Sequence, residues 1–113
     1  MSCVFCKILS GEAAAAIIYR DEQVTAFRDI HPIARTHILI IPNRHIASVN
    51  ELEPGDEALV GHMFMVAKAL AAQERVSENG YRLMINTGVH GGQTVPHLHL
   101  HLIAGKLARF LLG

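Results

Sequence analysis

The sequence predicts an α+β fold: a mostly antiparallel sheet of about five strands, one long helix and a short N-terminal helix. Short apolar segments are separated by short polar joins, which suit antiparallel neighbours because parallel strands need long crossovers. One stretch alone keeps helical periodicity over several turns. Near the C-terminus, histidine alternates with leucine as side chains alternate on a strand. We expect a single domain over residues 1–113.

The first half of the chain supplies the short helix and three strands. Residues 5–10 fit one helical turn, which Gly11 closes. Residues 17–20 and 23–28 are predicted strands on either side of a polar turn. Residues 37–42 (HILIIP) are a third strand, because β-branched apolar residues favour sheets.

The second half begins with Pro54 and acidic residues, which mark a helix start. Residues 79–80 (Asn-Gly) are expected to end that helix, because both residue types tolerate positive φ. Residues 82–87 and 97–103 are predicted strands, with a glycine-rich loop at 88–94 between them. The apolar residues that set the helical period are Leu59, Met63, Val66 and Leu70.

The composition excludes several classes of function. The chain is 50% hydrophobic with a formal net charge of zero, so it is not disordered and has no positive field for nucleic acid. No apolar run is long enough to span a membrane, and the N-terminus lacks the features of a secretory signal. We expect a cytoplasmic protein that binds neither nucleic acid nor membrane. Low charge with high apolar content also predicts an oligomer.

Three histidines alternate with leucines in residues 97–103 (HLHLHLI). On a strand, His97, His99 and His101 share one face, with neighbours about 6–7 Å apart, and the leucines face the core. A merely solvated face would not require histidine at all three positions. A metal site and a catalytic row, in which one histidine attacks and its neighbours orient it, both stay open.

The loop directly before this strand, GVHGGQT, is rich in potential donors. Paired glycines let backbone N–H groups approach an anion closely, and Thr94 adds a hydroxyl. A glycine pair alone is more often an ordinary turn. Beside a row of histidines, it favours an anionic group held next to a nucleophilic ring nitrogen.

Residues 92–103 (GQTVPHLHLHLI) resemble the signature of the histidine triad family, in which three alternating histidines precede apolar residues. The resemblance spans roughly residues 5–105 and includes AFRDI at 26–30, THILIIP at 36–42 and YRLMIN at 81–86. The chain is most similar to the Hint branch in length, in its Asn86 and in its GGQ loop. The Fhit branch, which cleaves dinucleotides, usually has glutamine at the Asn86 position.

This resemblance implies a nucleotide hydrolase acting on purine nucleoside 5′-phosphoramidates or related esters. His99 corresponds to the family nucleophile, which attacks the α-phosphorus and forms a covalent nucleotidyl-histidine before water releases the nucleoside monophosphate. His101 would lie near the leaving group, Asn86 would face the phosphate, and Thr94 with the loop amides would stabilise charge on the phosphate oxygens. His97, the first triad histidine, completes the candidate catalytic residues.

The resemblance also implies which residues bind the nucleotide. Asp29 matches the position that accepts hydrogen bonds from the ribose hydroxyls, which one carboxylate can do for two neighbours. Gly92 and Gln93 in the loop are expected to contact the nucleotide, while His37 matches a buried structural histidine. The residues that match the apolar purine pocket are Phe5, Ile8, Phe27, Ile30 and Leu39.

Cys3 and Cys6 form a Cys-X-X-Cys pair. The pair alone is compatible with two ordinary thiols, with a redox pair or with half of a zinc site. Bacterial members of the resembled family combine such a pair with a histidine after the Ile-Pro strand and with the first triad histidine, here His45 and His97. The resemblance therefore implies a structural zinc ion at these four residues, with no metal required for catalysis.

Other functions stay open for the sequence. They are a dinucleoside polyphosphate hydrolase or nucleotidyltransferase, a nucleotide-binding regulatory module with little turnover, and a metalloenzyme that uses all three histidines. The family habit is a homodimer, which an apolar tail at residues 106–113 and the long helix fit. This tail departs from the Hint pattern, so the sequence does not define the leaving group.

Overall fold

A five-stranded antiparallel sheet forms the centre of the protein, in the strand order β1-β2-β3-β5-β4. The computed structural model describes residues 3–105, so the tail at 106–113 lies outside the described residues. The predicted α+β fold, with its five strands, long helix and short N-terminal helix, is confirmed. The elements are α1 (Val4–Ser10), β1 (Ile17–Arg20), β2 (Val24–Arg28), β3 (Thr36–Pro42), α2 (Glu57–Gln73), β4 (Arg82–Met84) and β5 (Leu100–Ala104).

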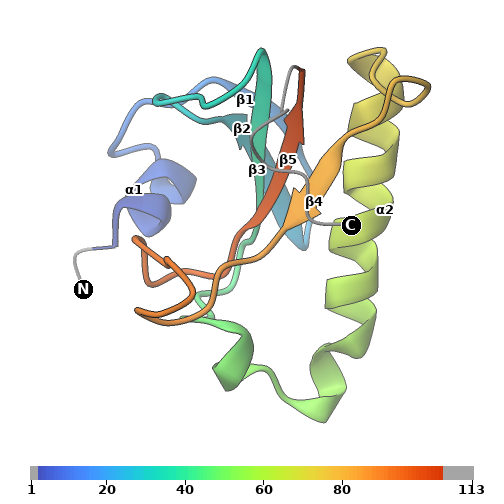
Figure 1. Cartoon of the computed structure of the whole chain (residues 1–113). Helices are drawn as coiled ribbons and strands as arrows, with labels where there is room; N and C mark the ends of the chain where they lie inside the picture. The colour runs from blue at the N-terminus through green and yellow to red at the C-terminus, as the bar shows by residue number, and fades with distance from the viewer. Residues whose placement is uncertain (1–2, 106–113) are drawn as a thin grey trace.

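Helix α2 lies along one face of the sheet, and α1 lies on the opposite face (Figure 1). Ile38 of β3 and Met63 of α2 are fully buried in the larger core between the sheet and α2. Leu39 and Ile41 point the other way and pack with Phe5 of α1. Because both faces are covered, residues 38–41 of β3 are a continuous apolar run rather than an alternating one. No helix within residues 3–105 has the length and apolar character needed to cross a bilayer.

The long helix ends earlier than the sequence predicts, at Gln73 rather than at residues 79–80. Arg75 adopts the left-handed conformation with a φ of 62°. The N–H groups of Arg75 and Val76 both donate to carbonyls in the last turn of α2. Such a pair of hydrogen bonds terminates a helix, and the left-handed residue is usually glycine. The prediction was wrong because an exposed arginine takes that position here.

The strand that carries the histidines is also shorter than the predicted range 97–103, because only Leu100–Ala104 pairs with its neighbours. Its partner β3 ends at Pro42, and the carbonyl of Pro42 accepts a hydrogen bond from the ring of His97 at 2.9 Å instead of from backbone. The N–H of Leu98 donates to the carbonyl of Ile46 at 2.7 Å. Residues 97–99 are therefore held by the last residue of β3, through the ring of His97, and by the loop after β3, without strand pairing.

The bounds of two further elements differ from those that the sequence predicts. Strand β4 covers Arg82–Met84 rather than residues 82–87, because its neighbour within residues 3–105, β5, begins at Leu100, and the pairing stops with Met84 opposite His101. The α-helix begins at Glu57, because Pro54 starts a separate turn of 3-10 helix.

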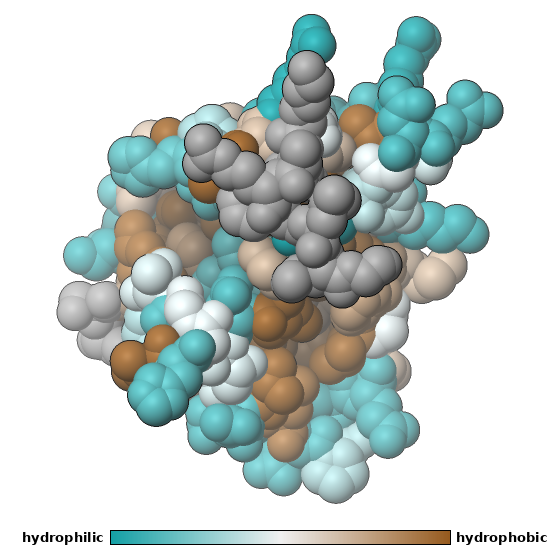
Figure 2. Space-filling view, viewed as in Figure 1, coloured by the Kyte–Doolittle hydropathy of each residue, from teal (hydrophilic) through white to brown (hydrophobic). Residues whose placement is uncertain are grey.

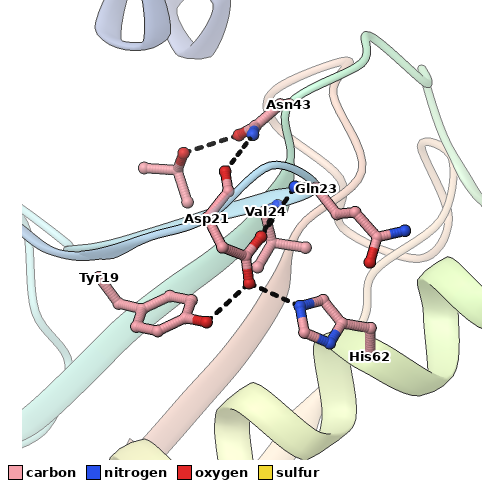
Figure 3. Close-up of polar contacts among 7 residues, drawn as sticks. Tyr19, Asp21, Gln23, Val24, Asn43 and His62 are labelled. Atoms are coloured by element: carbon pink, nitrogen blue, oxygen red, sulfur yellow. Dashed lines mark hydrogen bonds and ion pairs between the residues drawn. The ribbon is translucent and has the colours of Figure 1, made fainter.

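A polar cluster centred on Asp21 fastens the β1–β2 hairpin to α2 (Figure 3). One oxygen of Asp21 accepts from the hydroxyl of Tyr19 and from Nε2 of His62, each at 2.6 Å. The other accepts the N–H groups of Gln23 and Val24, each at 2.8 Å. Burial by itself raises the pKa of Asp21, but these hydrogen bonds outweigh it and hold the pKa well below its usual range.

Replacing Asp21 with alanine is expected to lower the free energy of unfolding by about 2 kcal/mol at neutral pH, because hydrogen bonds to a charged acceptor are lost. The pKa of Asp21 is lowered in the folded state. Its contribution is therefore present above the unfolded pKa of about 3.9 and is lost as the pH falls below that value. Urea unfolding of wild type and Asp21→Ala between pH 7 and pH 3 measures the difference.

Glu22→Ala removes an exposed carboxylate from the same turn and is the matched control. It is expected to unfold with the wild type, within about 0.5 kcal/mol. Equal urea midpoints for Asp21→Ala and Glu22→Ala at neutral pH would mean that the cluster does not stabilise the fold.

Candidate active site

A cavity of about 390 Å³ opens beside the histidines, on the face of the sheet that α1 covers. Many of the residues that the sequence proposes for catalysis and nucleotide binding lie on its wall. They are Phe5, Ile8, Phe27, Asp29, Ile30, Leu39, Thr94, His99 and His101. The fold therefore gathers the candidate nucleophile, the candidate ribose ligand and the apolar wall around one space.

Sequence reasoning missed several residues that also line the cavity. They are Val4, Ala13, Ala14, Ala15, Arg28, His31, Ile33, His37 and Val95. Alanine carries no chemical signal, and His31 and Ile33 belong to the loop between β2 and β3, whose path the sequence does not predict. His37 could have been suspected, because it is a histidine near the start of a strand that continues with four apolar residues.

His99 is buried, and one of its ring nitrogens is committed to the backbone. Its Nδ1 lies 2.7 Å from the carbonyl oxygen of His97. A carbonyl oxygen only accepts, so Nδ1 carries the proton and the neutral ring has its lone pair on Nε2. The ring of Phe5 packs edge-on against His99, with 5.1 Å between the ring centroids. His99 thus lines the cavity with a fixed ring whose Nε2 can act as a nucleophile.

His101 lies beside His99, with 4.9 Å between ring centroids, and is linked to His37. Nδ1 of His37 accepts the N–H of Ile33, so the neutral ring carries its proton on Nε2 and donates it to Nδ1 of His101 at 2.9 Å. His101 therefore carries its own proton on Nε2. Burial, and then repulsion from the two neighbouring histidines, lowers the pKa of His101 to about 4, although Asp29 opposes this. At neutral pH His101 is an uncharged donor.

Asp29 follows β2, and its two carboxylate oxygens have different neighbours. Oδ1 accepts the N–H of His31 at 2.9 Å, and Oδ2 lies 3.4 Å from Nε2 of His37. Burial lowers the pKa of His37 in spite of this carboxylate. Each carboxylate oxygen has more than one acceptor site, so both can still receive a hydroxyl from a ligand in the cavity.

Gln93 lies outside the cavity wall, and its side-chain amide binds within the protein. Nε2 donates to the carbonyls of Ala47 and Val95 at 2.7 and 3.0 Å, and Oε1 accepts the N–H of Gly88 at 3.0 Å. Gln93 therefore joins both ends of the glycine loop to the chain that follows β3.

Asn86 and Gly92 also lie outside the cavity wall. Nδ2 of Asn86 donates to the carbonyl of Gly91 at 2.7 Å. A Cβ on Gly91 would lie 2.2 Å from the carbonyl oxygen of Thr87, so no other residue fits without moving backbone. In this structure Asn86 shapes the loop next to the cavity.

Cys3, Cys6, His45 and His97 meet at one end of the histidine row, and their four ligand atoms lie within 4.8 Å of one another. The two Nδ1 atoms are 3.2 Å apart, and Sγ of Cys6 lies 3.2 Å and 3.7 Å from them. Sγ of Cys3 lies 3.5 Å from Nδ1 of His97. A tetrahedral zinc ion with ordinary bond lengths would separate two imidazole nitrogens by about 3.3 Å and sulfur from nitrogen by about 3.5 Å. The four residues therefore fit a tetrahedral metal.

The second ring nitrogen of His97 determines which lone pair faces this cluster. Nε2 donates to the carbonyl of Pro42 at 2.9 Å, so the neutral ring presents the lone pair of Nδ1 to the other three residues. His97 is fully buried, and burial lowers its pKa, which favours the neutral, metal-binding form. His97 does not line the cavity, so the structure groups it with the cysteines rather than with the nucleophile.

Asp29, His37 and His101 are a second group whose ligand atoms lie within 4.8 Å of one another. A metal fits this group poorly, because His37 accepts the N–H of Ile33 on Nδ1 and so presents an N–H rather than a lone pair from Nε2. The group is better described as a hydrogen-bonded chain beside the nucleophile.

The chain is similar to a known protein family and to a known enzyme. Residues 2–110 match the family model described as "Scavenger mRNA decapping enzyme C-term binding". The chain is 50% identical over 103 residues to the purine nucleoside phosphoramidase of Escherichia coli (strain K12). The match covers 91% of this chain and 87% of that protein.

Two solved structures show the same fold. A HIT family hydrolase from Legionella pneumophila Philadelphia 1 has a TM-score of 0.93 and 46% identity, and the match covers 99% of this chain and 100% of that one. A zinc-bound histidine triad family protein from Mycobacterium smegmatis has a TM-score of 0.82 and 36% identity, covering 99% of this chain and 81% of that one.

Proposed function

The chain belongs to the histidine triad family of nucleotide hydrolases, and we propose that it cleaves purine nucleoside 5′-phosphoramidates or related nucleoside monophosphate esters. The reaction would pass through a covalent intermediate on His99. The 50% identity to a purine nucleoside phosphoramidase supports this substrate class and the resemblance to the Hint branch.

The observation that carries the proposal is the fixed ring of His99 on the cavity wall. The carbonyl of His97 holds the proton on Nδ1 at 2.7 Å, so Nε2 bears the lone pair without any prior proton transfer. Edge-on packing of Phe5 restricts rotation of the ring. A nucleophile that is already oriented and in the correct tautomer loses little freedom in the transition state.

In the first step, Nε2 of His99 would attack the α-phosphorus, the P–N bond would break, and the leaving amine would take up a proton. In the second step, water would attack the same phosphorus and release a proton to solvent, the bond from phosphorus to Nε2 of His99 would break, and the nucleoside monophosphate would leave. His101 offers its Nε2–H to the leaving nitrogen or to a phosphate oxygen as an uncharged donor. Thr94 lines the cavity close by and adds a hydroxyl.

The rest of the cavity suits a purine nucleoside. Phe5, Ile8 and Phe27 are buried apolar residues on its wall, as a base that stacks in an apolar slot requires. Asp29 keeps acceptor sites on both oxygens beside the ribose position that the family resemblance implies. The base would therefore be held by packing and the sugar by a carboxylate.

We also propose that Cys3, Cys6, His45 and His97 hold a structural zinc ion. Support comes from the ligand distances and from the lone pair that His97 presents on Nδ1. The zinc-bound relative from Mycobacterium smegmatis adds to it. When bound, zinc would cross-link α1 to the loop after β3 and to the segment just before β5, and it would supply no chemistry to the reaction.

We propose further that two copies associate through the face that carries β4 and α2, where apolar side chains gather (Figure 2). Strand β4 is an edge of the sheet in the order of strands. Phe64 and Met65 on α2 are 41% and 61% exposed, although α2 already buries a separate apolar side against the sheet. An edge strand and exposed apolar residues on a helix each favour burial against a second copy.

Hydrolysis of adenosine 5′-phosphoramidate tests the function. His99→Ala is expected to lose at least about 10³-fold in kcat, because no other group can replace the nucleophile. Chelator-treated wild type is expected to keep turning over at saturating substrate. His62→Gln, on the helix that covers the other face of the sheet, is the control and should behave as wild type. Full activity in His99→Ala would rule out the covalent mechanism, and an inactive wild type would favour a binding module.

Metal analysis and thermal unfolding test the zinc proposal. Wild type is expected to bind one zinc ion per chain, and removal of the metal should lower the melting temperature by at least about 5 °C, or about 1 kcal/mol. His45→Ala should bind no zinc, and chelator should then leave its melting temperature unchanged. A wild type that takes up no zinc after reduction and reconstitution would contradict the proposal.

Sedimentation velocity tests the association. Wild type is expected to sediment with twice the mass of one chain, whereas Met65→Glu should shift towards the single chain, because a charge would be buried in the interface. Lys7→Glu, an exposed change on α1 across the sheet, is expected to leave the mass unchanged. A wild type that sediments as a single chain at all concentrations would contradict the proposed dimer.

A further inference from the structure

Cys3 and Cys6 occupy a position from which a disulfide can form without refolding the chain. Cys3 is the N-cap of α1, and its Sγ accepts the N–H of Cys6 at 3.4 Å. Three residues along a helix bring two Cα atoms to about 5 Å, within the range that disulfides span. The two Sγ atoms lie within 4.8 Å of each other, and both cysteines are free thiols.

The two cysteines differ in access. Cys3 is 2% exposed, whereas Cys6 is partly exposed at the surface of the cluster. A metal-bound cysteine is a thiolate, which is the form that attacks an oxidant. An oxidant would therefore reach Cys6 first, with Cys3 placed behind it to complete a disulfide.

Helix α1 connects this pair to the nucleotide cavity. Phe5 lies between the two cysteines in the sequence and packs against His97 and His99, with 5.8 and 5.1 Å between ring centroids. Val4, Phe5 and Ile8 of the same helix form part of the cavity wall. Loss of the cross-link at the first turn would therefore loosen a wall that the nucleotide contacts.

We propose that Cys3 and Cys6 are an oxidation site at which hydrogen peroxide releases the metal and weakens nucleotide binding. The Cys6 thiolate attacks one peroxide oxygen, the O–O bond breaks, and a sulfenic acid and hydroxide form. The Cys3 thiolate then attacks the Cys6 sulfur and displaces a second hydroxide. With two protons from solvent, both hydroxides become water. Two electrons pass from sulfur to peroxide, and zinc leaves because only His45 and His97 still offer lone pairs.

This proposal rests on the proposed zinc site, so the experiment begins with metal analysis of the full chain. Zinc-loaded protein is then treated with hydrogen peroxide in the presence of a chromophoric chelator. Disulfide is counted by mass spectrometry after alkylation of the remaining thiols. Zinc release and loss of both alkylatable thiols are expected to follow one time course. Dithiothreitol and fresh zinc should restore the starting state, because a disulfide is reducible and a sulfinic acid is not.

Cys6→Asp is the matched variant, because a carboxylate oxygen can replace the sulfur as a zinc ligand but cannot form a disulfide. Zinc release from it under the same peroxide is expected to be at least about tenfold slower, since only the buried Cys3 remains to react. For oxidised wild type, the KM for adenosine 5′-phosphoramidate should rise about tenfold, with a smaller change in kcat, because the helix at the cavity wall is loosened.

The outcomes separate the two proposals. Protein that binds no zinc before peroxide is added would end the zinc proposal and this one together. Zinc-loaded protein that keeps both thiols alkylatable, or that loses zinc as slowly as Cys6→Asp, would overturn the oxidation site and leave the zinc site standing. Zinc release with a disulfide but an unchanged KM would overturn the connection to nucleotide binding.

Discussion

The site depends on the hydrogen bonds and contacts that fix the position of His97. Its Nε2 donates to the carbonyl of Pro42 at the end of β3, its Nδ1 faces the two cysteines, and its own carbonyl accepts from His99. One residue thus ties the N-terminal helix, the central strand and the candidate nucleophile together. Since its ring is fully buried, any displacement would leave polar atoms without partners in a dry interior, which costs about 1–3 kcal/mol for each.

Side chains along the last strand and the residues before it alternate between the two faces of the sheet. This segment therefore contributes to the core and to the site at once. Leu98, Leu100 and Leu102 enter the core against α2, while the histidines between them face α1 and the cavity. A shift of one residue in register would exchange the two sets and put imidazoles into the apolar core. The larger hydrophobic core therefore fixes the register, and the register places the chemistry. The paired strand begins at Leu100. Before it, the N–H of Leu98 donates to Ile46 in the loop after β3, and the ring of His97 donates to Pro42 at the end of β3.

Those parts of the fold and of the site that have a periodic sequence pattern could be predicted from the sequence. The sheet, the long helix and the shared face of the histidines all follow from spacing, and the grouping of Cys3 with His97 followed from family resemblance. The end of α2 could not be predicted, because Arg75 adopts the left-handed conformation, which is usually adopted by glycine. The role of Gln93 was also hidden, since its three hydrogen bonds, to Gly88, Val95 and Ala47, depend on a chain path that no local pattern specifies.

Three neighbouring imidazoles on one face would repel one another if all were charged, and burial lowers the pKa of His97 and of His101. A different hydrogen-bond partner then fixes the tautomer of each neutral ring. A carbonyl accepts from Nε2 of His97, a second carbonyl accepts from Nδ1 of His99, and His37 donates to Nδ1 of His101. The three rings therefore present different atoms: a lone pair to the cysteines, a lone pair on Nε2 at the cavity, and an N–H donor beside it. Their chemical roles differ because their hydrogen-bond partners differ, although the sequence gives them equivalent positions in one row.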